Sequence, residues 1–143
     1  MSQLAVVAQT AYFGRRYLLS ASHRLNSDSL SAEENQRAYG KCNNPHGHGH
    51  NYVVEVLTAG PVDAETGMVV NLVDLDAAVR TLVLQRFDHA NLNLDPLFAN
   101  RVPTTENLCR VVFDLLKGPL ANVKLEYVRV EETENNFFQY FGG

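Results

Sequence analysis

Three of the chain's five histidines fall within the segment His46-Gly47-His48-Gly49-His50. Alternate residues of a β-strand project from the same face, so His48 and His50 would point the same way if a strand begins here. Two such imidazoles can bind one metal ion. His46 would share their face only if the extended backbone continued back through turn-prone residues, so it is left out of the predicted ligands. A glycine-rich loop with exposed histidines is the alternative.

A third ligand must come from another part of the chain. His23 ends a predicted strand that could lie beside the first. Three neutral imidazoles with an open fourth position are typical of a catalytic rather than a structural zinc site. We therefore expect His23, His48 and His50 to form such a site.

Cys42 lies six residues before His48, in a segment followed by turn residues. It could be a fourth zinc ligand, a buried inert thiol, or a thiolate base or nucleophile activated by nearby positive charge. The other cysteine, Cys109, lies in a segment of helical periodicity, where packing is the expected role. Two cysteines cannot form the disulfide framework of a small secreted domain, which favours a reducing cytoplasm.

Two acidic segments could also carry chemistry. In Asp88-His89, a carboxylate could fix the tautomer of a proton-transferring histidine, although such pairs also occur at helix ends. Residues 131–136 end a predicted strand with three carboxylates among amides. A carboxylate can accept two hydrogen bonds from a guanidine-like N–H pair, as on the 2-amino pyrimidinone edge of a pterin. A solvated acidic turn is the alternative.

Two apolar series with helical spacing begin at capping residues. Asp74 precedes the first series, and Thr104 precedes the second, which Gly118 ends. A capping box that starts at Ser31 predicts a further short helix.

The β-prone runs lie at residues 12–22, 52–58, 68–72, 123–130 and 137–141. Turn residues at 60–63 and 65–67 predict that the second and third runs form an antiparallel hairpin. Together the elements predict an α+β fold with helices on one face of an antiparallel sheet. Open sheet edges and the aromatic run 137–141 favour assembly into an oligomer.

Length and composition exclude several classes of protein. The 143 residues, 45% hydrophobic and 20% charged, fit a single globular domain over residues 1–143. Twelve Lys and Arg against sixteen Asp and Glu give a net charge of −4, and scattered basic residues argue against a nucleic-acid partner. Because residues 1–10 lack a signal-peptide pattern and no run approaches the roughly 18 apolar residues of a membrane span, we expect a soluble cytoplasmic protein.

Five motifs of this chain, in their order and separations, resemble the 6-pyruvoyl-tetrahydropterin synthase family. They are SASHRL (20–25), GKCNNPHGHGHNY (40–52), DHANL (88–92), PTTEN (103–107) and ETENN (132–136). The resemblance implies a T-fold (tunnelling fold) subunit, a four-stranded antiparallel sheet with two helices on one face. Three subunits would close a barrel, and two trimers would stack into a homohexamer.

The resemblance also implies roles for site residues. The three predicted histidine ligands would bind zinc, and Cys42 would be the general base. Asp88 and His89 would reach the same site from a neighbouring subunit and act as the second proton-transfer group. Glu132 would anchor the pterin ring. The remaining residues of the implied pterin pocket are Thr104, Thr105 and Glu106.

The implied reaction converts 7,8-dihydroneopterin triphosphate to 6-pyruvoyl-tetrahydropterin with loss of triphosphate, a lyase step of tetrahydrobiopterin-type biosynthesis. Four basic residues are candidates for binding the triphosphate, and their spacing does not rank them: Arg15, Arg16, Arg24 and Lys41. The alternative on the same scaffold is the 6-carboxy-tetrahydropterin synthase of queuosine biosynthesis, whose Cys-to-His spacing is tighter than the five residues between Cys42 and His48. A folate-related branch, which typically has glutamate in place of Cys42, is disfavoured. A non-catalytic zinc or pterin-binding module is the alternative outside the enzymes.

Overall fold

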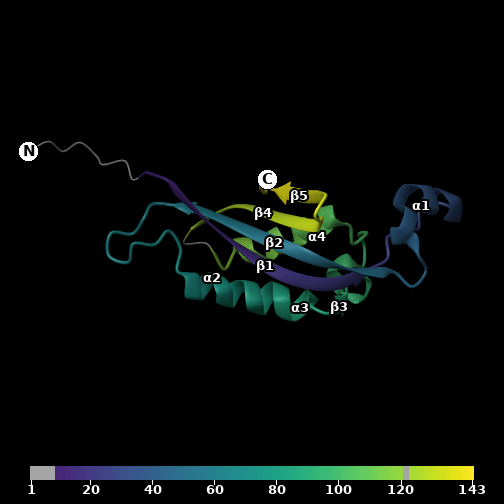
Figure 1. Cartoon of the computed structure of the whole chain (residues 1–143), viewed down its shortest axis with the longest axis horizontal. Helices are drawn as coiled ribbons and strands as arrows, with labels where there is room; N and C mark the ends of the chain where they lie inside the picture. Colours follow the sequence, from purple (N-terminus) through teal and green to yellow (C-terminus); the bar gives the residue numbers. More distant parts are fainter. Residues whose placement is uncertain (1–8, 121–122) are drawn as a thin grey trace, which may run out of the picture.

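The computed structural model describes residues 9–120 and 123–143. Its centre is a sheet of five strands in the order β3-β1-β2-β4-β5. Two long strands, β1 and β2, run side by side along the molecule (Figure 1). The strand bounds are β1 (Ala11–His23), β2 (His48–Gly60), β3 (Ala90–Asn91), β4 (Lys124–Thr133) and β5 (Asn136–Tyr140).

Two helical segments cover one face of this sheet. The first joins α2 (Leu72–Val79), a π-helical turn η2 (Arg80–Leu84) and α3 (Gln85–Phe87). The second is α4 (Thr105–Lys117), reached from β3 through the 3₁₀ turns η3 (Leu92–Leu94) and η4 (Pro96–Phe98). No helix in the described part of the chain is long and apolar enough to cross a membrane.

A third helix, α1 (Ala32–Tyr39), lies beyond the end of the sheet (Figure 1). The 3₁₀ turn η1 (Gly40–Asn43) follows it and leads back to β2. The capping box predicted at Ser31 is confirmed, because its side chain accepts from the Glu34 amide and the Glu34 carboxylate accepts from the Ser31 amide. Cys42 therefore lies on the connection that joins β1 to β2, the two strands that carry the histidines.

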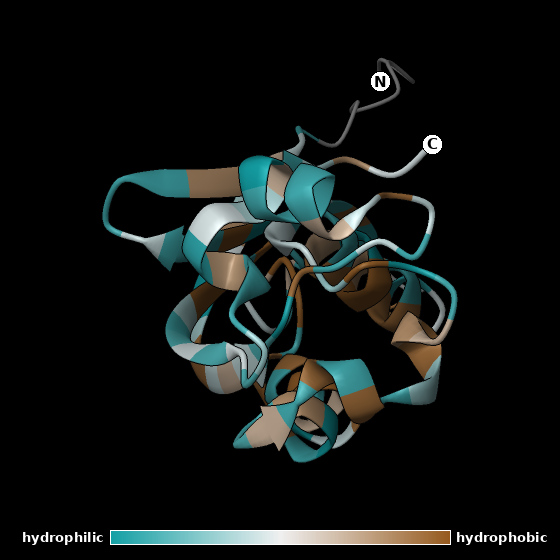
Figure 2. Ribbon diagram, turned by 90° about the vertical axis from the view of Figure 1, so that its right-hand side faces the viewer, coloured by the Kyte–Doolittle hydropathy of each residue, from teal (hydrophilic) through white to brown (hydrophobic). Residues whose placement is uncertain are grey.

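The core lies between the helices and the sheet. In β2 the alternate residues Tyr52, Val54 and Val56 are fully buried on the helix side, as expected for a strand with one face in the core. The hydropathy colouring in Figure 2 alternates along the ribbons, because each element has one apolar face. Continuing the alternation back along β2 places His50 and His48 on the same face, at the rim of the core.

The predicted α+β class and four of the predicted strands are confirmed. The strand predicted at 68–72 is wrong, because Asn71 caps α2: its side chain accepts from the amides of Val73 and Asp74. The hairpin predicted from the turns at 60–67 is therefore wrong as well, and α2 begins at Leu72 rather than after Asp74. Instead of pairing with residues 68–72, β2 pairs antiparallel with β1.

The implied sheet of four antiparallel strands is also incorrect. The sheet has a fifth strand, β3, which pairs in parallel with β1 through Ala21 opposite Ala90 and Ser22 opposite Asn91. A strand of two residues is too short to have a periodicity that the sequence could reveal.

Candidate metal centre

Four side chains converge where β1 ends and β2 begins. The ligand atoms of His23, Cys42, His48 and His50 all lie within 4.8 Å of one another. His23 pairs directly with His48 in the antiparallel register, and His50 follows two residues later on the same face. The prediction that the strand of His23 lies beside the strand of the other two histidines is confirmed.

The three histidines direct the same ring nitrogen toward a common point. His50 Nε2 is 3.1 Å from His23 Nε2 and 3.1 Å from His48 Nε2, and Cys42 Sγ is 3.2 Å from His48 Nε2. Burial is the main cause that lowers the pKa of both His23 and His50, which favours neutral rings. Neutral imidazole and thiolate are the ligands that zinc prefers, so the donor set fits a bound divalent ion.

Cys42 is held at this point by backbone contacts. Its carbonyl accepts from the Leu25 amide at 2.7 Å, and the neighbouring Asn43 side chain, which is buried, donates to the Leu25 carbonyl at 2.7 Å. Burial, then the charge of Glu132, raises the pKa of the Cys42 thiol. Cys42 is thus positioned either to bind a metal or to act beside one. The packing role expected for Cys109 is consistent with its full burial in the core.

Glu132, on β4, brings a carboxylate to the same site. Its Oε1 lies 3.0 Å from His50 Nε2, and its Oε2 accepts a short hydrogen bond from the Thr105 hydroxyl. Thr104 caps α4 by accepting from the Asn107 amide, as predicted. The N-terminus of α4 and the end of β4 therefore meet beside the histidines, whereas Glu106 is exposed on the first turn of α4.

Asp88 and His89 lie at the edge of the sheet and are not members of the four-residue group. Asp88 Oδ1 accepts from the Ser20 amide at 2.9 Å, and the His89 amide donates to the Ser20 carbonyl at 2.5 Å. The His89 side chain is 82% exposed, with Nε2 3.6 Å from Asp88 Oδ2. Its backbone has φ +60°, a left-handed conformation that is uncommon outside glycine. The pair thus faces away from the core.

The basic residues proposed for the triphosphate differ in their contacts. Arg15 pairs with Asp76 at 2.8 Å, and Arg16 pairs with Glu55 at 2.8 Å, so both guanidinium groups already have carboxylate partners. Lys41 is exposed.

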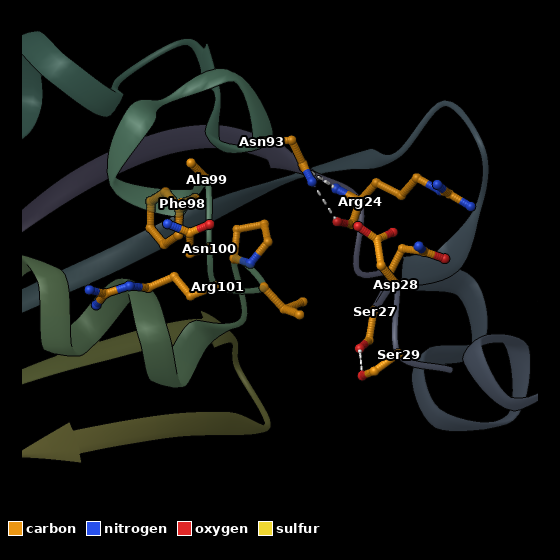
Figure 3. Close-up of a pocket in the computed structure, with 12 residues that line it drawn as sticks. Arg24, Ser27, Asp28, Ser29, Asn93, Phe98, Ala99, Asn100 and Arg101 are labelled. Atoms are coloured by element: carbon orange, nitrogen blue, oxygen red, sulfur yellow. Dashed lines mark hydrogen bonds between the residues drawn. The ribbon is translucent and has the colours of Figure 1, made fainter. Parts of the chain in front are cut away.

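Arg24 borders a cavity of about 540 Å³ between residues 24–29 and 98–103 (Figure 3). The guanidinium groups of Arg24 and Arg101 extend in opposite directions, away from the space between them, and Asp28 adds a carboxylate. Asn93 links the two walls through hydrogen bonds to the backbone of Arg24. This cavity therefore does not gather positive charge, and it is separate from the histidine group.

Two residues near the three histidines have no role in the sequence-based prediction. The carbonyl of Pro103 lies 2.8 Å from His23 Nδ1, and the Tyr52 hydroxyl lies 3.2 Å from the same atom. The spacing of Tyr52 from His50 could have predicted its place on the ligand face. A backbone carbonyl such as that of Pro103 leaves no signal in the sequence.

Comparison with known proteins gives matches along nearly the whole chain. Residues 13–143 match the family model described as 6-pyruvoyl tetrahydropterin synthase. The human 6-pyruvoyl tetrahydrobiopterin synthase is 49% identical over 133 residues, 92% of each chain. The Drosophila melanogaster protein of that name is 46% identical over 134 residues, 92% of this chain and 80% of the relative.

A solved structure extends the agreement to three dimensions. The Caenorhabditis elegans 6-pyruvoyl tetrahydropterin synthase structure is 42% identical in sequence, with a TM-score of 0.89 over 94% of this chain and 97% of that one. A match over residues 13–143 and these identities establish homology along nearly the whole chain. The chain belongs to the 6-pyruvoyl tetrahydropterin synthase family.

Proposed function

We propose that this chain is a 6-pyruvoyl-tetrahydropterin synthase that eliminates triphosphate from 7,8-dihydroneopterin triphosphate. The observation that carries the proposal is the convergence of His23, His48 and His50 with Cys42 at one point, beside Glu132. The relatives named for this activity are 46% and 49% identical over 92% of the chain. The reaction moves hydrogens within the substrate and therefore needs no external reductant.

Zinc is the ion we propose for the three histidines. When bound, it would supply positive charge that acidifies the C–H and O–H groups of the substrate side chain and favours the thiolate of Cys42. Cys42 Sγ, 3.2 Å from His48 Nε2, then removes a proton from the substrate side chain and returns it at another position. The two hydrogen bonds between this turn and the backbone of Leu25 keep the sulfur in place during this transfer.

Glu132 is the proposed anchor of the pterin ring. A carboxylate accepts two hydrogen bonds from the paired N–H groups of a 2-amino pyrimidinone edge, with good geometric specificity. The Thr105 hydroxyl orients this carboxylate from the N-terminus of α4. Thr104 and Glu106, at the same helix end, complete the proposed pocket.

Asp88 and His89 are proposed as the second proton-transfer group, acting in the site of a neighbouring subunit. The support is their position, because they lie at the exposed sheet edge instead of joining the histidine group of their own chain. An exposed carboxylate–imidazole pair can exchange protons with a substrate held by another subunit.

We propose a homohexamer of two stacked trimers, built from one domain per chain over residues 1–143. In the described part of the chain, β1 has a pairing partner on its outer edge only at Ala21 and Ser22, and β5 ends the sheet on the other side. Phe137 and Phe141 are more than half exposed near that second edge. Strand pairing between subunits would cover both edges.

The test is the product formed from 7,8-dihydroneopterin triphosphate under anaerobic conditions with zinc present. We expect triphosphate release and a pyruvoyl side chain, identified by mass spectrometry and by the absorbance of the tetrahydropterin. A carboxy or hydroxymethyl side chain would assign the chain to another activity of this scaffold. Absence of triphosphate release from a zinc-loaded protein would indicate a binding module.

A further inference from the structure

His23 is the most enclosed of the three histidines, with 1% of the residue exposed. Its two ring nitrogens have different surroundings. Nε2 faces the other ligands, 3.1 Å from His50 Nε2. Nδ1 faces the Pro103 carbonyl at 2.8 Å and the Tyr52 hydroxyl at 3.2 Å.

These contacts decide which nitrogen carries the proton. A carbonyl oxygen can only accept a hydrogen bond, so Nδ1 must be the donor to Pro103. In a neutral ring the lone pair then resides on Nε2, the atom that faces the proposed metal position. The opposite tautomer would set the Nδ1 lone pair against the carbonyl oxygen and leave Nε2 unable to bind a metal.

The Tyr52 hydroxyl is compatible with the same tautomer. Its oxygen is a second acceptor close to Nδ1–H, and the ring lies edge-on to His23 with centroids 6.3 Å apart. Tyr52 is completely buried, and among residues 9–120 and 123–143 its hydroxyl has no other hydrogen-bond partner. A buried tyrosine hydroxyl normally has a partner, and here the partner is the metal-facing histidine.

We propose that Tyr52 is a positioning residue for the metal site, and that with the Pro103 carbonyl it holds His23 in the tautomer and ring orientation that bind zinc. The proposal rests on the zinc site of the proposed function. Acceptors on the second nitrogen of a ligating histidine raise its basicity, and their loss typically weakens metal binding by about 10–100-fold.

The contact between the Pro103 carbonyl and His23 also links the metal ligand to the start of α4. The next residue, Thr104, caps α4, and Thr105 binds Glu132, whose other oxygen reaches His50. One short segment thus sets the orientation of a metal ligand and of the proposed pterin anchor. Tyr52 contacts the same His23 nitrogen from β2.

The test is zinc affinity, measured by competition with a chromophoric chelator. We expect Tyr52→Phe, which keeps the buried ring, to bind zinc about 10–100-fold more weakly than wild type. Tyr17→Phe is the matched control: the Tyr17 hydroxyl donates to Asp76 at 2.6 Å and contacts none of the histidines, so this variant should keep the wild-type affinity.

A second measurement separates positioning from a general loss of structure. Long-range ¹H–¹⁵N spectra of the zinc-free proteins report the tautomer of His23. We expect the Nδ1–H form in wild type and also in Tyr52→Phe, because the Pro103 carbonyl still accepts from Nδ1. Weaker zinc binding by this variant would then come from lost orientation of the His23 ring and not from a general loss of structure. Zinc affinity of Tyr52→Phe within twofold of wild type, or a His23 ring converted to the Nε2–H form in this variant, would overturn the role of Tyr52. Failure of the wild-type chain to bind zinc would instead overturn the metal site itself.

Discussion

Gly47 leaves no room for a side chain beside the backbone carbonyl of His23. A β-carbon placed on Gly47 would stand 2.6 Å from that carbonyl oxygen, and the residue has φ +69°. A side chain here would therefore strain the backbone and push on a proposed metal ligand. We expect Gly47→Ala to lower the free energy of unfolding by about 1–2 kcal/mol, because alanine is disfavoured in the left-handed conformation. The clash with the His23 carbonyl should lower it further and weaken zinc binding.

Gly67→Ala is the control for this substitution. Gly67 has φ +72°, almost the same conformation, but no atom lies within 4 Å of an added β-carbon. In denaturant titrations, Gly67→Ala should lose only the stability that the left-handed conformation costs, and its zinc affinity should be unchanged. Equal losses in the two variants would show that the contact with His23 has no effect.

His48 and His46 provide a test of the ligand set by elemental analysis. His48→Ala should lose bound zinc, because it removes one of three converging Nε2 atoms. His46→Ala should keep about one zinc per chain, since His46 is exposed and outside the four-residue group. Full zinc content in His48→Ala would refute the three-histidine site.

Cys42→Ala should lower triphosphate release by roughly 10²–10⁴-fold, the usual contribution of a general base, with the zinc content close to one per chain. Loss of zinc together with activity would make Cys42 a ligand rather than a base. Cys109→Ala is the control, and should keep its turnover despite lower stability, because that thiol lies in the core and donates to the Val128 carbonyl.

Glu132→Gln should weaken pterin binding more than zinc binding. A hydrogen bond to a charged group contributes about 1.5–3 kcal/mol, which corresponds to roughly a 10–100-fold change in pterin Kd by calorimetry. Glu134→Gln, on an exposed neighbour in the same acidic run, should leave both affinities unchanged. Unchanged pterin affinity in Glu132→Gln would exclude Glu132 as the anchor.

Asp95 gives a pH-dependent contribution to stability. Hydrogen bonds from Arg86, at 2.8 Å to each carboxylate oxygen, hold the pKa of Asp95 below its usual value. The stabilisation is therefore complete above the ordinary aspartate pKa of about 3.9 and is lost as the pH falls through the lower folded value.

Asp95→Asn tests this dependence, since an amide oxygen can still accept from the Leu97 amide as Asp95 does. At pH 7 we expect it to cost up to about 1 kcal/mol, the usual limit for an exposed pair. The difference in Tm between wild type and variant should shrink toward zero in acid. A difference independent of pH would rule out the ion pair as its cause.

Residues with a strong local pattern were predictable from the sequence. The alternation of His48 and His50, the cap at Thr104 and the capping box at Ser31 depend on neighbours a few residues away, and the structure agrees with each. Asn71 shows the limit of such patterns, because its side chain ends an apolar run that otherwise has strand propensity. Local signals compete, and the cap prevailed over strand propensity.

The remaining features depend on contacts between distant segments. Thr105 meets Glu132 only because α4 packs against β4, and Pro103 reaches His23 through a backbone atom that any residue would possess. β3 exists because the chain passes the end of β1 on its way to α4. None of these contacts leaves a periodic or compositional trace, so only the folded chain reveals them.

The bonds of Asp88 and His89 to Ser20 set a limit on β1 as a template for another strand. They use both the amide and the carbonyl that Ser20 directs outward. A strand added along this edge can therefore form its ladder only as far as Leu18, the last residue before Ser20 whose amide and carbonyl face this edge. One serine backbone thus fixes how far a docking segment can advance along this edge.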